Sequence, residues 1–200
     1  IGSMEDLDAA SLEDVEQFFR TYYAPNNAVL TIAGAFESAR ALERVQHYFG
    51  EVPHGPPIPP IPGRTDLPTT LGGEVREVVT SDVSLPRIYL GYRIPVYGTD
   101  EFYAAAVASY ILAYGKASLL YRTLLRRRGM AQDLVAYAFP IVVGASMLIL
   151  WATARPGTAV DPLERALLDE IATLADVAED DVARAIGLIE AKHLTDLQRM

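Results

Sequence analysis

The chain has 200 residues, of which 50% are hydrophobic and 22% are charged, so it can bury a core and is not a disordered polypeptide. Its 17 basic and 26 acidic residues give a net charge of −9, which argues against nucleic acid as the main partner because phosphate binding needs a basic face. It has no cysteine, which excludes disulfides and thiolate chemistry, and no apolar run of the about 18 residues that a membrane span needs.

Residues 1–52 are predicted to form a helix, a turn, a strand and a second helix. Ser11 and Asp14 have the spacing of a capping box, and a helical stripe of apolar residues follows: Leu12, Val15, Phe18, Phe19 and Tyr22. After a turn at residues 25–27, residues 28–33 predict a short strand that ends at Gly34. The second helix is expected over residues 37–49, with Gly50 as its cap and a buried side formed by Leu42, Val45, Tyr48 and Phe49.

Residues 53–73 are predicted to be an extended linker. They contain seven of the thirteen prolines of the chain: Pro53, Pro56, Pro57, Pro59, Pro60, Pro62 and Pro68. Such a segment forms neither a helix nor an inner strand and is expected to be polyproline-like and stiff. Its simplest role is to join two structured blocks, and binding to an aromatic groove is the alternative interpretation.

Residues 74–200 are predicted to alternate strands with helices. The predicted strands cover residues 74–80, 87–94, 132–139 and 145–154. The predicted helices cover residues 99–114, 118–128, 161–174 and 179–200. Asp161, followed by Pro162, is expected to cap the third of these helices. This order indicates an α+β fold in which an antiparallel or mixed sheet has helices packed on one face.

The residues that usually carry hydrolytic chemistry are sparse. His47, His54 and His193 form no His-x-x-Glu-His motif. Glu190 and His193 make one isolated helical pair, for which a solvated surface is a simpler interpretation than a metal site. Neither Gly-x-Ser-x-Gly nor a glycine-rich phosphate loop occurs. The sequence therefore predicts no catalytic and no metal-binding residue in this chain.

One basic cluster lies near the end of the helix predicted at residues 118–128. It consists of Arg122, Arg126, Arg127 and Arg128. Cations at a helix C-terminus are favoured by the helix dipole, which explains the cluster without a ligand, and an anion or peptide-carboxylate site is the functional alternative. The stripe of Tyr103, Tyr110 and Tyr114 is interpreted as core and core edge.

Several short motifs follow one another along the chain. Residues 11–34, with Tyr-Tyr-Ala-Pro-Asn-Asn at 22–27, contain a helix, a Tyr-x-Pro-x-Asn turn and a strand that ends in Gly, and residues 48–53 read Tyr-Phe-Gly-Glu-Val-Pro. Residues 115–121, Gly-Lys-Ala-Ser-Leu-Leu-Tyr, are followed by Arg-Gly-Met-Ala at 128–131. In this order, the motifs resemble those of the insulinase/pitrilysin-type zinc metallopeptidase family over nearly the whole chain.

The resemblance implies a C-terminal, non-zinc portion of a bacterial-type member. A full chain of that family contains two homologous α+β halves of LuxS/processing-peptidase-like architecture, joined by a linker. Residues 1–52 would end the first half, residues 53–73 would be the linker, and residues 74–200 would be a second half truncated at its C-terminus. The zinc ligands would then precede Ile1, so that zinc is expected in the parent protein and not in this chain.

The implied function is to wall the chamber of a metalloendopeptidase and to contact its peptide substrate. Substrate contacts are expected at Arg126, Arg127, Gln132 and Tyr137. Active second halves carry an Arg and a Tyr where this chain has Leu125 and Gln132, unless a one-residue slip gives the first role to Arg126. The loss suits a zinc-bearing subunit whose partner supplies the pair. It equally suits an inactive paralogue that serves as a scaffold or assembly subunit. A third interpretation of the chain is an unrelated α+β domain that binds a small molecule.

The implied partners are the N-terminal zinc-bearing half, a second subunit with the Arg/Tyr pair, and a peptide. The chain stops before the helix, turn and strand that end a second half, which would leave one sheet position unfilled. Residues 11–34 are the equivalent element, so we expect them to fill that position in the same chain or, as a homodimer or strand swap, in a neighbouring copy. Composition leaves the compartment open between cytoplasm and periplasm.

Overall fold

The computed structural model describes residues 3–60 and 67–199. The chain divides into an N-terminal unit, residues 1–63, and a C-terminal unit, residues 64–200. None of the described helices combines the length and the apolar character that crossing a membrane would require.

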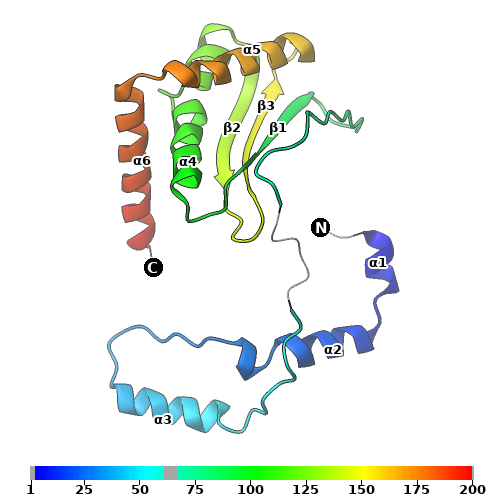
Figure 1. The fold of residues 1–200 in the computed structure, drawn as a ribbon, viewed down its shortest axis with the longest axis vertical. Helices are drawn as coiled ribbons and strands as arrows, with labels where there is room; N and C mark the ends of the chain where they lie inside the picture. The colour runs from blue at the N-terminus through cyan, green and yellow to red at the C-terminus, as the bar shows by residue number, and fades with distance from the viewer. Residues whose placement is uncertain (1–2, 61–66, 200) are drawn as a thin grey trace. The chain divides into compact units, whose positions relative to one another are not determined.

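The N-terminal unit is built from short helices: α1 (Met4–Ala9), α2 (Leu12–Tyr22), a 3₁₀ turn (Pro25–Asn27) and α3 (Ser38–Phe49) (Figure 1). The predicted capping box at the start of α2 is confirmed. The backbone N–H of Ser11 donates to Asp14 Oδ2 at 2.8 Å, and the N–H of Asp14 donates to Ser11 Oγ at 3.2 Å. Gly50 ends α3 as predicted, with its N–H donating to the carbonyl oxygen of Gln46 at 2.9 Å.

Two predictions for this unit are wrong. Residues 28–33 are assigned to no strand. An isolated extended segment has no ladder to pair its backbone groups, and high β-propensity does not replace a partner. The predicted buried side of α3 is also largely exposed, with Leu42 exposed by 68%, and the apolar stripe of α2 is exposed as well, with Leu12 exposed by 75%.

The proline-rich segment forms neither helix nor strand over residues 53–60 and 67–73, and Pro62 lies outside the described residues. Its start is tied to the 3₁₀ turn by the side chain of Asn26. Asn26 Oδ1 accepts the N–H of Gly55 at 3.1 Å, and Asn26 Nδ2 donates to the carbonyl oxygen of Pro56 at 2.9 Å. Ala24, which directly precedes this turn, is the one described residue of the N-terminal unit that is buried.

The C-terminal unit contains an antiparallel sheet of β1 (Arg87–Ile94), β3 (Ser146–Ala154) and β2 (Ala131–Phe139), in that spatial order (Figure 1). In the register, Trp151 of the central strand lies opposite Tyr89 on one side and Val135 on the other. These three strands were predicted. The fourth predicted strand, residues 74–80, is wrong: the segment is irregular, and Arg76 pairs with Glu164 instead of entering the sheet.

Three helices lie on one side of the sheet: α4 (Asp100–Ala113), α5 (Val160–Ala172) and α6 (Glu179–Leu197) (Figure 1). Helix α4 packs on the strands and α6 packs on α4. Thr99 caps α4, and its Oγ1 accepts the N–H of Phe102 at 3.3 Å. Asp161 is not the cap of α5, because the helix begins at Val160 and places Asp161 in its first turn.

The core of this unit lies between the helices and one face of the sheet. The largest fully buried side chains are leucines: Leu112, Leu120, Leu124, Leu150, Leu163 and Leu167. Successive strand residues point to opposite faces, so Leu150 and Ala152 enter the core while Ile149 and Trp151 lie on the face without helices. The predicted α+β class, with helices packed on one face of an antiparallel sheet, is confirmed.

Candidate functional site

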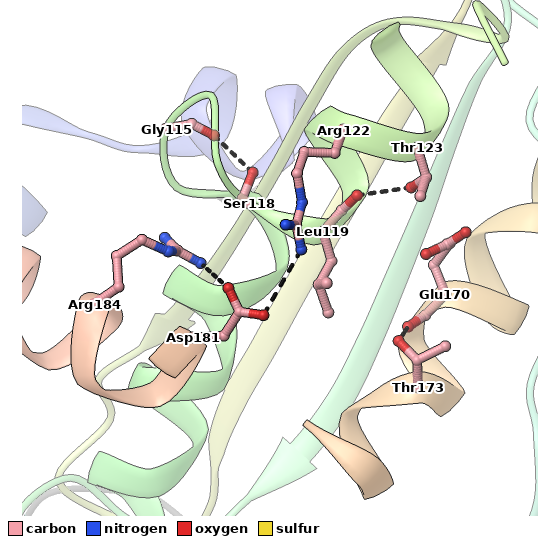
Figure 2. Close-up of polar contacts among 9 residues, drawn as sticks. All are labelled: Gly115, Ser118, Leu119, Arg122, Thr123, Glu170, Thr173, Asp181 and Arg184. Carbon is pink, nitrogen blue, oxygen red and sulfur yellow. Dashed lines mark hydrogen bonds and ion pairs between the residues drawn. The ribbon is translucent and has the colours of Figure 1, made fainter. Parts of the chain in front are cut away.

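Two of the predicted contact residues, Arg126 and Arg127, end a π-helix (Tyr121–Arg127) where an ordinary helix was predicted. Ser118 Oγ donates to the carbonyl oxygen of Gly115 just before it, and Thr123 Oγ1 donates to that of Leu119 inside it, both at 2.7 Å (Figure 2). The π-helix is rare, and its short occurrences are frequent at functional sites.

The chain turns directly from this helix into β2. Gly129 adopts a φ of +61°, which glycine reaches without the steric cost of a side chain. The N–H of Met130 then donates to the carbonyl oxygen of Leu124 at 2.9 Å. The exposed arginines at the end of the π-helix are therefore held close to the first residues of β2.

Carboxylates of α5 and α6 lie beside the arginines at positions 122, 127 and 128, and Figure 2 shows Asp181 between Arg122 and Arg184. Asp181 lies 3.7 Å from Arg122 Nη2 and accepts a hydrogen bond from Arg184 Nη2 at 3.0 Å. Glu170 is buried, and its Oε1 lies 3.9 Å from the Nη2 atom of Arg127 and 3.8 Å from that of Arg128. Partly exposed ion pairs of this kind contribute at most about 1 kcal/mol each, so their main effect is to orient the side chains.

The predicted contact residues do not form one cluster. Arg126 and Arg127 are exposed, and Gln132 is exposed at the irregularity in the β2 register between Ala131 and Asp133. Tyr137 lies five residues beyond Gln132, or about 17 Å along an extended strand at about 3.4 Å per residue. The structure thus brings the first three residues to one end of β2 and leaves Tyr137 apart.

Leu125 occupies the position where the resemblance places an Arg in active second halves. It is half-buried and packs against the core cluster. An apolar side chain held there offers no hydrogen bond to a ligand.

Four aromatic side chains lie on the open face of the sheet and form what we call the aromatic row: Tyr89, Trp151, Tyr137 and Phe139. Of these, the sequence predicted only Tyr137 as a contact residue. The ring centroid of Trp151 lies 6.2 Å from that of Tyr89 and 5.8 Å from that of Tyr137, and the Phe139 ring lies 6.3 Å from that of Tyr137. The alternating neighbours of these residues, such as Leu90 and Ala136, pack against the core. The row therefore lies on the face that the helices leave uncovered.

A charged pair marks one end of the aromatic row. Arg87 Nε donates to Thr153 Oγ1 at 2.7 Å, and Arg87 Nη2 lies 3.8 Å from Asp133 Oδ2. Arg87 Nη1 also donates to the hydroxyl oxygen of Tyr89 at 3.3 Å. This hydrogen bond, together with the nearby Asp133 carboxylate, raises the pKa of Arg87, so the guanidinium keeps its charge.

The described residues do not fit a resident metal ion. Among them, no three His, Cys, Asp or Glu side chains lie close enough together to bind one. Glu190 and His193 both lie exposed on α6, and His54 Nδ1 lies 2.8 Å from the carbonyl oxygen of Gly55. The two residues of the helical pair supply fewer ligands than the four that zinc usually takes.

Comparisons with known proteins agree with one another. A family model described as the peptidase M16 inactive domain matches residues 9–188. The curated zinc protease PqqE of Helicobacter pylori is 23% identical over 186 residues, which cover 92% of this chain and 41% of that protein. The chain thus spans about two fifths of the length of this relative.

Two solved structures have a similar fold. A protease from Helicobacter pylori superposes with a TM-score of 0.85 at 21% identity, covering 98% of this chain and 48% of its own. A peptidase M16 inactive domain from Pseudomonas fluorescens gives a TM-score of 0.74 at 15% identity, covering 94% of this chain and 45% of its own.

Proposed function

This chain belongs to the peptidase M16 family as one of its inactive C-terminal domains, and from that membership we propose that it walls the peptide chamber of a zinc-dependent metalloendopeptidase and contacts the substrate. The name of the Helicobacter pylori relative, a zinc protease, supports zinc in the parent protein. That relative is longer than this chain, and zinc ligands would lie in the additional sequence.

The N-terminal unit supports the proposed division into residues 1–52, a linker at 53–73, and residues 74–200. Helices α2 and α3 expose apolar sides that include Phe18, Phe19 and Phe49, each about half exposed. A helix with an uncovered apolar stripe gains little stability alone, so these sides are suited to packing on further polypeptide. In our proposal that polypeptide is the rest of the first half.

The observation that carries the proposed peptide contact is the open face of the sheet. Helices cover the other face, the open one presents the aromatic row, and the exposed Arg126 and Gln132 lie at one end of β2. Aromatic side chains and arginine are the residues that contribute most to protein–peptide binding. Arg127 contributes less in this proposal, because Glu170 already engages it.

A second candidate function is that of an inactive paralogue that serves as a scaffold or assembly subunit. Leu125 and Gln132 are compatible with it, because they stand where the resemblance places the Arg and Tyr of active second halves, and they are equally compatible with a zinc-bearing subunit whose partner supplies that pair. The two candidates differ in the sequence that precedes Ile1. A His-x-x-Glu-His motif in the upstream coding region supports the peptidase, and a parent chain without it supports the scaffold.

The proposal is tested with the 200-residue chain and with its parent protein. We expect the chain alone to hold no stoichiometric zinc and to hydrolyse no quenched fluorescent peptide. One equivalent of zinc together with chelator-sensitive hydrolysis by this chain would overturn its non-catalytic role. In the parent, Arg126→Ala and Tyr137→Ala should raise KM several-fold, whereas Arg165→Ala on α5 should leave it unchanged. Unchanged KM in both variants would refute the proposed contact.

A further inference from the structure

We infer that the aromatic row selects peptide segments whose side chains toward the sheet are uncharged and aliphatic or aromatic. The inference rests on the proposed peptide contact and names the class of segment that this contact favours.

The first argument is the apolar character of the open face. Tyr89 and Phe139 have exposed fractions of 65% and 46%, and half-buried Trp151 and Tyr137 lie between them. The side chains between the rings are also apolar on this face: Val135, Met147 and Ile149. Covering such a surface with an apolar side chain removes hydrocarbon from water on both partners.

The second argument is the charge of the same face. The chain carries a net charge of −9, yet Asp133 is the one carboxylate that the three strands place on this face, and Arg87 compensates it at 3.8 Å. The other arginine of the face, Arg93, donates to the carbonyl oxygen of Pro68 at 3.4 Å. The arginine beside Tyr89, Arg87, is already paired with Asp133, so a charged peptide side chain over the rings would lose water for little gain in ion pairing, whereas an uncharged one loses nothing comparable.

The third argument is the backbone at Gly91, which lies opposite Ile149 in the register. Gly91 presents no side chain on the open face, and a Cβ there would approach Met147 Cε to 3.3 Å. The flexible Met147 side chain therefore fills the space that Gly91 leaves and adds apolar surface beside the rings. Because an extended peptide points alternate side chains to opposite sides, the favoured segment has apolar residues at every second position.

The test uses Trp151, the single tryptophan of the chain, as a reporter of the row. The full chain is titrated with three peptides of equal length that differ at alternate positions: Leu and Phe in the first, Ala in the second, and Lys in the third. We expect the first peptide to shift Trp151 emission and to bind about tenfold more tightly than the second. Tyr89→Ser should weaken this binding several-fold, whereas Tyr103→Ser on α4, a tyrosine of similar exposure, should not.

The outcomes separate the inference from the proposed function. Equal binding of all three peptides in calorimetry, or a preference for the lysine peptide, overturns the apolar selection and leaves the peptide contact standing. Absence of binding by every peptide overturns both. An emission shift that depends on the concentration of the chain alone, with a dimer in sedimentation, assigns the row to a second copy and overturns the peptide occupant.

Discussion

The two units of this chain differ in how far their helices bury apolar side chains. In the C-terminal unit, α4 and α5 bury Leu112, Leu163 and Leu167 completely against the sheet and one another. In the N-terminal unit, α2 and α3 have clear apolar stripes, but Leu12 and Leu42 are exposed by 75% and 68%. The difference is that only one unit contains a paired sheet on which helices can pack.

This difference shows what an apolar pattern specifies. The stripe fixes which side of a helix is to be covered, but the covering surface comes from elsewhere in the fold. The isolated first turns of a helix are costly to form, so an uncovered helix of eleven or twelve residues is marginal in water. The N-terminal unit should therefore be far less stable than the C-terminal unit when the chain is alone.

The largest expected effect is in native-state hydrogen exchange. Amides of β3, the central strand, should exchange only through global unfolding, which costs about 5 kcal/mol or more in ordinary domains. Amides of α3 should open locally and exchange about a thousandfold faster or more. Mass spectrometry of peptic fragments measures both. Equal protection of α3 and β3 would show that the N-terminal unit is stable without a partner.

A pair of leucine substitutions sharpens the comparison. Leu150→Ala removes a fully buried side chain from the core and should reduce the free energy of unfolding by about 2–5 kcal/mol. Leu42→Ala, in α3, should change it by less than about 0.5 kcal/mol because the side chain is already in water. Urea unfolding followed by Trp151 fluorescence measures the first and circular dichroism the second. A large loss in Leu42→Ala would contradict the exposed state of α3.

The sequence predicts those elements whose signals are local or whose partners are also in the chain. The capping box at Ser11 and the strand at 87–94 both appear as predicted. Residues 28–33 and 74–80 have comparable β-propensity but form no strand. Propensity describes how well a residue fits a sheet, and it does not supply the neighbouring strand.

The candidate site was predictable only in part for a similar reason. Arg126, Arg127 and Gln132 are close in sequence, so a motif could point to all three. The aromatic row joins residues of three strands, and its members meet only through the antiparallel register of Tyr89, Trp151 and Val135. A single sequence shows the alternation in each strand but not the register that aligns the strands.

A smaller effect is expected where the Asn26 side chain forms hydrogen bonds with the start of the proline-rich segment. A Cβ on Gly55 would lie 2.4 Å from Ala24 Cβ and 2.8 Å from Asn26 Oδ1, so Gly55→Ala should break the Asn26 hydrogen bonds. We expect cleavage within residues 53–60 by a dilute protease to accelerate about fivefold. Gly73→Ala is the matched control, because nothing lies within 4 Å of its added Cβ. Equal rates of cleavage in both variants would refute the structural role of the Asn26 hydrogen bonds.

The smallest effect concerns the cap of α2 and its dependence on pH. Hydrogen bonds from the Ser11 hydroxyl and then from its backbone N–H lower the pKa of Asp14. Because the folded pKa lies below the unfolded value of 3.8, the stabilisation is fully present above that value and is lost as the pH falls through the folded pKa. The NMR amide shifts of residues 12–15 should therefore move toward coil values below about pH 4. In Asp14→Asn this transition should disappear, and its persistence would assign the transition to another carboxylate.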